Sequence, residues 1–115
     1  MSTTNPARGE VWMVDFDPTK GHEQAGRRPA LVVSVDTFNS SPAGLVIVLP
    51  ITSKAKGIRS HVEVTPQKTN LPVKSFIKCE DVRSVAKERL FRRRGSVSPQ
   101  TLAAIEYRLR ILLGL

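Results

Sequence analysis

The 115-residue sequence predicts a single α+β domain that is mainly β, with an antiparallel sheet and a C-terminal helix. Three observations predict this fold: aliphatic runs of strand length, prolines and glycines between those runs, and one long amphipathic segment at the end. The length suits one domain with a modest core of its own. Residues 1–7 precede the first apolar run and are expected to form a flexible tail.

Six apolar runs are predicted to be strands. Two of them, residues 30–35 and 45–49, are almost continuously aliphatic, which is typical of strands buried on both faces. The other four are shorter or alternate imperfectly, and they cover residues 11–16, 61–64, 76–79 and 82–85. Short polar or proline-containing segments separate the runs and are expected to form turns and loops.

Residues 98–113 are predicted to form the helix. Ser98 is a favourable N-cap residue and Pro99 suits the first helical position. Apolar residues then recur at helical spacing and give one stripe, with which the helix would close a small barrel or pack beneath it. This stripe consists of Leu102, Ile105, Leu109, Leu112 and Leu113.

The formal charge of +8 is unevenly distributed, with a balance of −1 over residues 1–40, +4 over residues 41–86 and +5 over residues 87–115. This bias favours a polyanionic partner: nucleic acid, an anionic membrane surface or an acidic protein. No apolar run reaches the roughly 20 residues that span a bilayer. The N-terminal residues lack the apolar middle of a secretory signal, and the chain has one cysteine, so a cytoplasmic location is expected.

A polar segment between the first two predicted strands carries groups suited to acid–base chemistry. Glu23 is a candidate base, His22 a candidate acid or base, and Arg28 a fixed positive charge. Pro29 restricts the backbone of Arg28 to extended geometry, which helps to orient its side chain. The alternative is that Glu23 and an arginine form an ordinary surface ion pair, worth about 0–1 kcal/mol.

Two further clusters follow later strands. Thr52 and Ser53, with Lys54, Lys56 and Arg59 after them, could hold a phosphate oxygen, or the two hydroxyls could simply end a strand and cap a turn. The segment 78–83 carries charges of both signs and could equally be an exposed edge with ordinary ion pairs. The two histidines and one cysteine lack the close spacing of metal ligands, so neither a metal nor a cofactor is expected. Cys79 is expected to be a small buried residue.

Three segments, in their order along the chain, resemble the MazF/PemK family of toxin endoribonucleases from bacterial toxin–antitoxin pairs. The first is Arg8-Gly9-Glu10-Val11-Trp12, continued by Asp15-Phe16-Asp17-Pro18-Thr19-Lys20-Gly21-His22-Glu23-Gln24-Ala25-Gly26 and Arg28-Pro29-Ala30. The others are Pro50-Ile51-Thr52 and Cys79-Glu80-Asp81-Val82-Arg83-Ser84. The resemblance extends from residue 8 to the C-terminal helix.

The resemblance implies a small SH3-like antiparallel barrel, shared with CcdB-like toxins, that works as a homodimer. It implies sequence-selective cleavage of single-stranded RNA (mRNA) without a metal, in which the 2′-hydroxyl attacks and leaves a 2′,3′-cyclic phosphate and a 5′-hydroxyl. It also implies a MazE-like antitoxin whose acidic, flexible tail covers the active groove. The positive charge suits both partners, since RNA and an acidic tail would compete for one surface.

The resemblance also assigns roles to individual residues. Arg28 matches the family's arginine before proline and Thr52 its threonine after the second aliphatic strand, the pair assigned to the scissile phosphate. Glu23 matches a loop carboxylate implicated in some members. The Kid-like branch uses a loop histidine with an arginine and an aspartate, and this chain has His22 but Lys78 and Glu80 at those positions. Lysine lacks the bidentate fork of arginine.

Our hypothesis makes Arg28 the electrostatic clamp, Thr52 the orienting hydroxyl and Glu23 the base, with His22 as the rival base and possible acid. The residues expected to bind RNA are Phe16, Lys54, Lys56, Lys78, Glu80 and Arg83. Phe16 could instead fill the core.

The run Arg92-Arg93-Arg94 could contact RNA, bind the antitoxin or form a solvated face. A competing interpretation of the whole chain is a non-catalytic SH3-like binding module or a CcdB-like topoisomerase poison. The joint presence of Arg28, Thr52 and Glu23 favours the enzyme.

Overall fold

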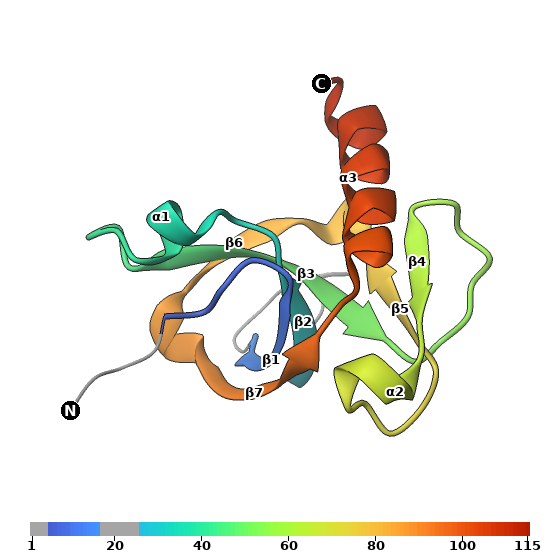
Figure 1. Cartoon of the computed structure of the whole chain (residues 1–115), viewed down its shortest axis with the longest axis horizontal. Coiled ribbons are helices and arrows are strands. Elements are labelled where there is room, and N and C mark those ends of the chain that lie inside the picture. The colour runs from blue at the N-terminus through green and yellow to red at the C-terminus, as the bar shows by residue number, and fades with distance from the viewer. Residues whose placement is uncertain (1–4, 17–25) are drawn as a thin grey trace.

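The computed structural model describes residues 5–16 and 26–115 (Figure 1). The strands are β1 Glu10–Asp15, β2 Arg27–Val32, β3 Leu45–Thr52, β4 His61–Val64, β5 Ser75–Lys78, β6 Arg83–Ala86 and β7 Leu90–Ser96. The helices are α1 Asp36–Asn39, α2 Pro66–Thr69 and α3 Pro99–Leu113, with short 3-10 turns η1 Cys79–Asp81 and η2 Lys87–Arg89. The prediction of a mainly β antiparallel fold with a C-terminal helix is confirmed.

Strand β3 holds the sheet together because it pairs with three other strands. The order is β4-β5-β3-β2-β1-β7, and β6 also pairs with β3. The first half of β3 pairs with β6, whereas its last residues, Ile51 and Thr52, pair with β5. The other edge of β3 pairs with β2 in antiparallel register. In Figure 1, β3 therefore lies at the centre of the curved sheet.

The alternation of side chains along β3 divides the core into two clusters. Leu49 and Ile51 belong to the larger cluster, which α3 covers with Ile105. Val46 and Val48 belong to the second, together with Phe16 from the end of the first strand. A strand that is apolar at nearly every position is thus buried on both faces, as its sequence predicts.

Helix α3 packs on the sheet as far as Leu109, and its last turn extends beyond it. The Ser98 hydroxyl accepts a hydrogen bond from the Thr101 N–H at 3.2 Å, which confirms the predicted N-cap. Ile105 is fully buried, but Leu112 and Leu113 are 46% and 54% exposed. The predicted apolar stripe is therefore wrong in its last turn, because the helix extends beyond the body that it covers (Figure 1).

Strand β7 was not predicted, because its central residues are arginines. Arg92 and Arg93 are exposed, and β7 stands at the end of the strand order, paired with β1. Charged side chains are common on such strands because they discourage pairing with a further chain.

The described residues before β1 are packed rather than forming the expected tail. Asn39, fully buried, donates a hydrogen bond to the Pro6 carbonyl at 2.9 Å. The ammonium group of Lys87 donates to the Asn5 side-chain carbonyl at 2.7 Å. Residues 1–4 lie outside the described part of the chain.

The anchoring of α3 can be tested with Ile105→Ala. The change leaves a cavity under the helix and should lower the free energy of unfolding by about 2–5 kcal/mol in chemical denaturation. The control is Gln100→Ala, an exposed position on the same helix that should change it by less than about 0.5 kcal/mol. Equal effects of the two variants would show that α3 is not fixed through Ile105.

Candidate active site

Arg28 and Thr52 meet because β2 and β3 are adjacent strands. Arg28 lies opposite Val14 on β1, and Ala30 lies opposite Pro50 on β3. Continuing that register by two residues places Arg28 opposite Thr52. Arg28 is exposed and Thr52 is half-buried, so both are at the margin of the sheet.

A cavity of about 290 Å³ lies at this margin and is lined by both residues. Ser53 and Arg94 add polar groups to its wall, and Met13 and Leu71 are among its apolar residues. Sites for small ligands have volumes from roughly 300 Å³ upward, so this cavity is at the lower end of their range. A phosphate group with part of its sugar is therefore a suitable occupant in size and charge.

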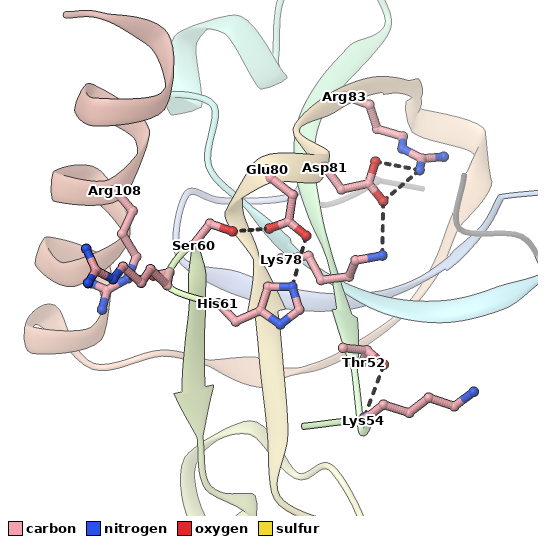
Figure 2. A network of polar contacts seen from close by, with 10 residues as sticks. Thr52, Lys54, Ser60, His61, Lys78, Glu80, Asp81, Arg83 and Arg108 are labelled. Carbon is pink, nitrogen blue, oxygen red and sulfur yellow. Dashed lines mark hydrogen bonds and ion pairs between the residues drawn. The ribbon is translucent and has the colours of Figure 1, made fainter. Parts of the chain in front are cut away.

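The Thr52 hydroxyl has a local structural role as well. Its oxygen accepts a hydrogen bond from the Lys54 N–H at 3.2 Å, as Figure 2 shows. This bond caps a turn, which is the second of the two roles that the sequence allows for the Thr52 hydroxyl. A hydroxyl that accepts one bond still carries its own proton, so Thr52 can donate to a phosphate oxygen in the same geometry.

The segment that carries Glu23 and His22 begins and ends beside Arg28. The Phe16 N–H donates to the Gly26 carbonyl at 2.9 Å, so the chain leaves β1 and returns to β2 at one point. Glu23 and His22 themselves lie outside the described residues. Lys54 and Lys56 are described and are exposed between β3 and β4.

Asp81 organises the cations of the 78–83 segment (Figure 2). The two carboxylate oxygens of Asp81 accept from the Arg83 guanidinium at 2.8 and 3.0 Å. The Lys78 ammonium lies 3.6 Å from the same carboxylate. Lys78 and Arg83 thus form ion pairs within the protein. This agrees with the alternative interpretation of segment 78–83, an edge with ordinary ion pairs.

Phe16 is a core residue. It is 3% exposed, and the Arg83 guanidinium lies 4.9 Å from the centre of its ring, at cation–π distance. This position corrects the expectation that Phe16 stacks on an RNA base, because the ring has core residues and Arg83 against it.

Glu80 is held by two donors at the start of β4, Ser60 just before the strand and His61 as its first residue (Figure 2). The Ser60 hydroxyl donates to one carboxylate oxygen at 2.6 Å, and His61 Nε2 lies 2.9 Å from the other. Burial raises the pKa of Glu80, but the hydrogen bonds from Ser60 and His61 outweigh it and leave the pKa below its ordinary value. Glu80 is consequently an anion at neutral pH and does not attract phosphate.

His61 is a residue that the sequence interpretation missed, having considered it only as a metal ligand. Its side chain is 4% exposed, and its Nδ1 is buried with no hydrogen-bond partner among the described residues. The alternation His61-Val62-Glu63-Val64 was the available signal, because it places His61 on the face opposite the core. Its pairing with Lys78 in the β4–β5 register brings it to Glu80.

Cys79 is fully buried, as expected, and burial raises the pKa of its thiol to about 11. Such a thiol is almost entirely protonated at neutral pH and is a poor nucleophile. Within residues 5–16 and 26–115, no group of three or more His, Cys, Asp or Glu side chains is arranged to hold a metal ion. In the same ranges, no helix has the length and apolar character needed to cross a membrane.

Sequence comparisons show extensive similarity to known toxins. Residues 7–113 match the family model described as PemK-like, MazF-like toxin of type II toxin–antitoxin system. The chain is 40% identical over 113 residues to endoribonuclease MazF9 of Mycobacterium tuberculosis, covering 94% of this chain and 96% of that protein. It is 34% identical over 110 residues to endoribonuclease toxin MazF of Escherichia coli K12, covering 95% of each.

Solved structures agree with this similarity. A crystal structure of MazF from Deinococcus radiodurans matches with a TM-score of 0.87 and 32% identity, over 98% of this chain and all of that one. A MazE–MazF complex from the same organism contains a chain that matches with a TM-score of 0.82 and 28% identity, over 97% and 99% of the two chains.

The contacts of Glu80 predict a pH-dependent contribution to stability. Because the folded pKa is lowered, the contribution is complete above the unfolded pKa of about 4.3 and is lost as pH falls through the folded pKa. In Glu80→Gln it should be absent. The difference in unfolding free energy between wild type and variant should therefore shrink between about pH 6 and pH 3, by less than about 1 kcal/mol because solvent screens this carboxylate.

Denaturant titrations at each pH would measure this difference. Ser60→Ala keeps the carboxyl group but removes one donor, so it should lose only part of the pH-dependent difference. Parallel stability curves for wild type and Glu80→Gln across the range would contradict the assignment.

Proposed function

The chain belongs to the family of PemK-like, MazF-like toxins of type II toxin–antitoxin systems, and we propose that it is an endoribonuclease that cleaves single-stranded RNA. The observation that supports this most is the cavity shared by Arg28 and Thr52, which come from separate strands. The names of the similar proteins from M. tuberculosis and E. coli support the same activity. The proposed substrate is single-stranded mRNA, cut at a preferred sequence.

The proposed reaction is an internal transfer that needs no protein nucleophile. The 2′-oxygen of the RNA attacks the adjacent phosphorus, the bond from phosphorus to the 5′-oxygen breaks, and a 2′,3′-cyclic phosphate and a 5′-hydroxyl result. Negative charge builds up on the phosphoryl oxygens as the 2′-oxygen approaches. Arg28 stabilises that charge through charge-assisted hydrogen bonds, and the Thr52 hydroxyl orients the phosphate.

Two protons must move in this reaction. A base removes the proton of the 2′-hydroxyl, and an acid protonates the departing 5′-oxygen. Arg28 is unsuited to either task because a guanidinium neither gives up nor takes on a proton readily. Glu23 is the proposed base, and His22 is the rival base and proposed acid. Both belong to the segment whose ends are joined by the Phe16–Gly26 hydrogen bond, next to Arg28. No metal ion takes part in this proposal.

The proposed protein partner is an acidic antitoxin of the MazE type. The formal charge of +8 would attract both its acidic tail and RNA to one surface. The matching MazE–MazF complex supports such a pairing. We further propose that the toxin is a homodimer, because the last turns of α3 expose apolar side chains that a second copy could bury, including Ile111 and Leu113. The proposed location is the cytoplasm.

The activity can be tested by incubating the protein with a long mixed-sequence single-stranded RNA in the presence of a chelator. Discrete fragments with 5′-hydroxyl and 2′,3′-cyclic phosphate ends are expected, and their mapped ends would give the preferred bases. Intact RNA with a protein that still binds it would support a non-catalytic module. Intact RNA together with inhibited topoisomerase would support a CcdB-like poison.

The clamp predicts the effect of two variants on this cleavage. Arg28→Ala should lower kcat/KM about 10²–10³-fold because a preorganised stabiliser of the transition state is lost. Thr52→Val keeps the shape but removes the proposed hydrogen bond to the phosphate together with the turn cap to the Lys54 N–H, so a loss of at least about 10-fold is expected. Arg110→Ala, an exposed cation on α3, is the charge-matched control. A folded Arg28→Ala protein that cleaves at the wild-type rate would exclude the clamp.

The pH dependence of cleavage separates the two candidate proton-transfer groups. If Glu23 is the base, Glu23→Gln should remove the acidic limb of the kcat/KM profile and reduce the rate about 10²–10⁴-fold. His22→Gln should then affect only a limb near the ordinary histidine pKa of about 6.5. Loss of the acidic limb in His22→Gln alone would reverse the assignment.

A further inference from the structure

We propose that Arg94 is a second phosphate-binding residue of the site, positioned by Asn70, and that it binds the RNA phosphate next to the scissile one. The inference rests on the proposed function. It starts from the fact that Arg94 lines the same cavity as Arg28 and Thr52. The other two arginines of the run 92–94 are exposed on β7.

A β-bulge gives Arg94 its distinct direction. In the β1–β7 register, Trp12 pairs with Arg93 and Val11 pairs with Gly95, so Arg94 is the extra residue between two consecutive pairs. An extra residue bends the strand and changes the direction of its side chain, and such bulges are frequent next to active sites. Arg94 is accordingly less exposed than either arginine before it.

Asn70 holds Arg94 at both of its ends. The Asn70 side-chain amide donates to the Arg94 carbonyl at 2.8 Å, and the Arg94 guanidinium donates to the Asn70 carbonyl at 2.5 Å. Asn70 has a φ of 55°, the one positive value for a non-glycine residue in the described chain. This left-handed residue ends α2 and directs both of its polar groups to β7.

The charges in the cavity favour an occupant with more than one phosphate. A guanidinium has five N–H donors, and the bond to Asn70 uses only one of them. Arg28 and Arg94 bring two positive charges to a cavity of about 290 Å³. Successive phosphates of a single strand carry two neighbouring negative charges. Arg93 is different, since its guanidinium pairs with Glu10 at 2.7 Å.

The first test compares two arginines of the same strand on a short RNA that contains one mapped cleavage site. Arg94→Ala should lower kcat/KM about 10–100-fold, as expected for the loss of charge-assisted hydrogen bonds. Arg92→Ala removes the same charge two residues away and should change it less than about threefold. Arg94→Lys should recover part of the loss. Equal losses in Arg92→Ala and Arg94→Ala would overturn the proposal.

The second test identifies the phosphate. Neutral methylphosphonates are placed one at a time at the phosphates on either side of the scissile one. At one position the substitution should slow the wild type about 10-fold or more and leave the already slower Arg94→Ala unchanged, because the two changes remove one contact. The same penalty for both proteins at every position would overturn the proposal.

The role of Asn70 is tested with Asn70→Gly, which keeps the left-handed backbone and removes the amide. It should slow cleavage less than Arg94→Ala does, and it should have no effect in the Arg94→Ala background. Additive losses would contradict a positioning role.

If the wild type cuts no RNA, the proposed function fails. If Arg94→Ala cuts normally but no longer binds a polyglutamate peptide, Arg94 serves an acidic protein partner and the inference alone fails.

Discussion

The pairing of β3 with β2 on one edge, and with both β6 and β5 on the other, is the constraint on which the site depends. Three neighbours fix the direction of β3 and its register. Its interior residues are buried on both faces, so a slip by one position would exchange Leu49 for Val48 between the two clusters of the core. The end of β3 is consequently fixed, and Thr52 with it. Arg28 follows from the same register on β2.

Some cations of this face form ion pairs with carboxylates, and two arginines line the cavity. Lys78 and Arg83 meet Asp81, and Arg93 meets Glu10. These carboxylates partly cancel the field of those cations, so the total of 18 Lys and Arg residues overstates how many cations attract a phosphate. Arg28 and Arg94 differ because they line a cavity of suitable size. In the proposed site a phosphate would meet two guanidiniums from the strands on either side of β1, one on β2 and one on β7.

The strands with a strong apolar signal were predictable, and those with a charged or interrupted signal were not. Residues 45–49 and the N-cap at Ser98 were identified from composition and spacing alone. Strand β7 was missed because its arginines hide the pattern, and its pairing with β1 depends on contacts distant in the sequence. Arg94 could not be separated from Arg92 and Arg93 for the same reason, since a bulge is visible only when both strands are known. Phe16 had two interpretations, and the position of Arg83 on its ring decides between them.

The proposed site draws its groups from two parts of the chain. Arg28 and Thr52, the proposed phosphate-binding residues, stand on strands whose register the core determines. The candidate proton-transfer groups belong to the segment between Phe16 and Gly26, whose two ends are joined by a hydrogen bond of 2.9 Å. Glu23 is five residues from Arg28 along the chain. A binding module would need only the strands, whereas cleavage needs both parts, and their junction at Arg28 is where binding and proton transfer would be coupled.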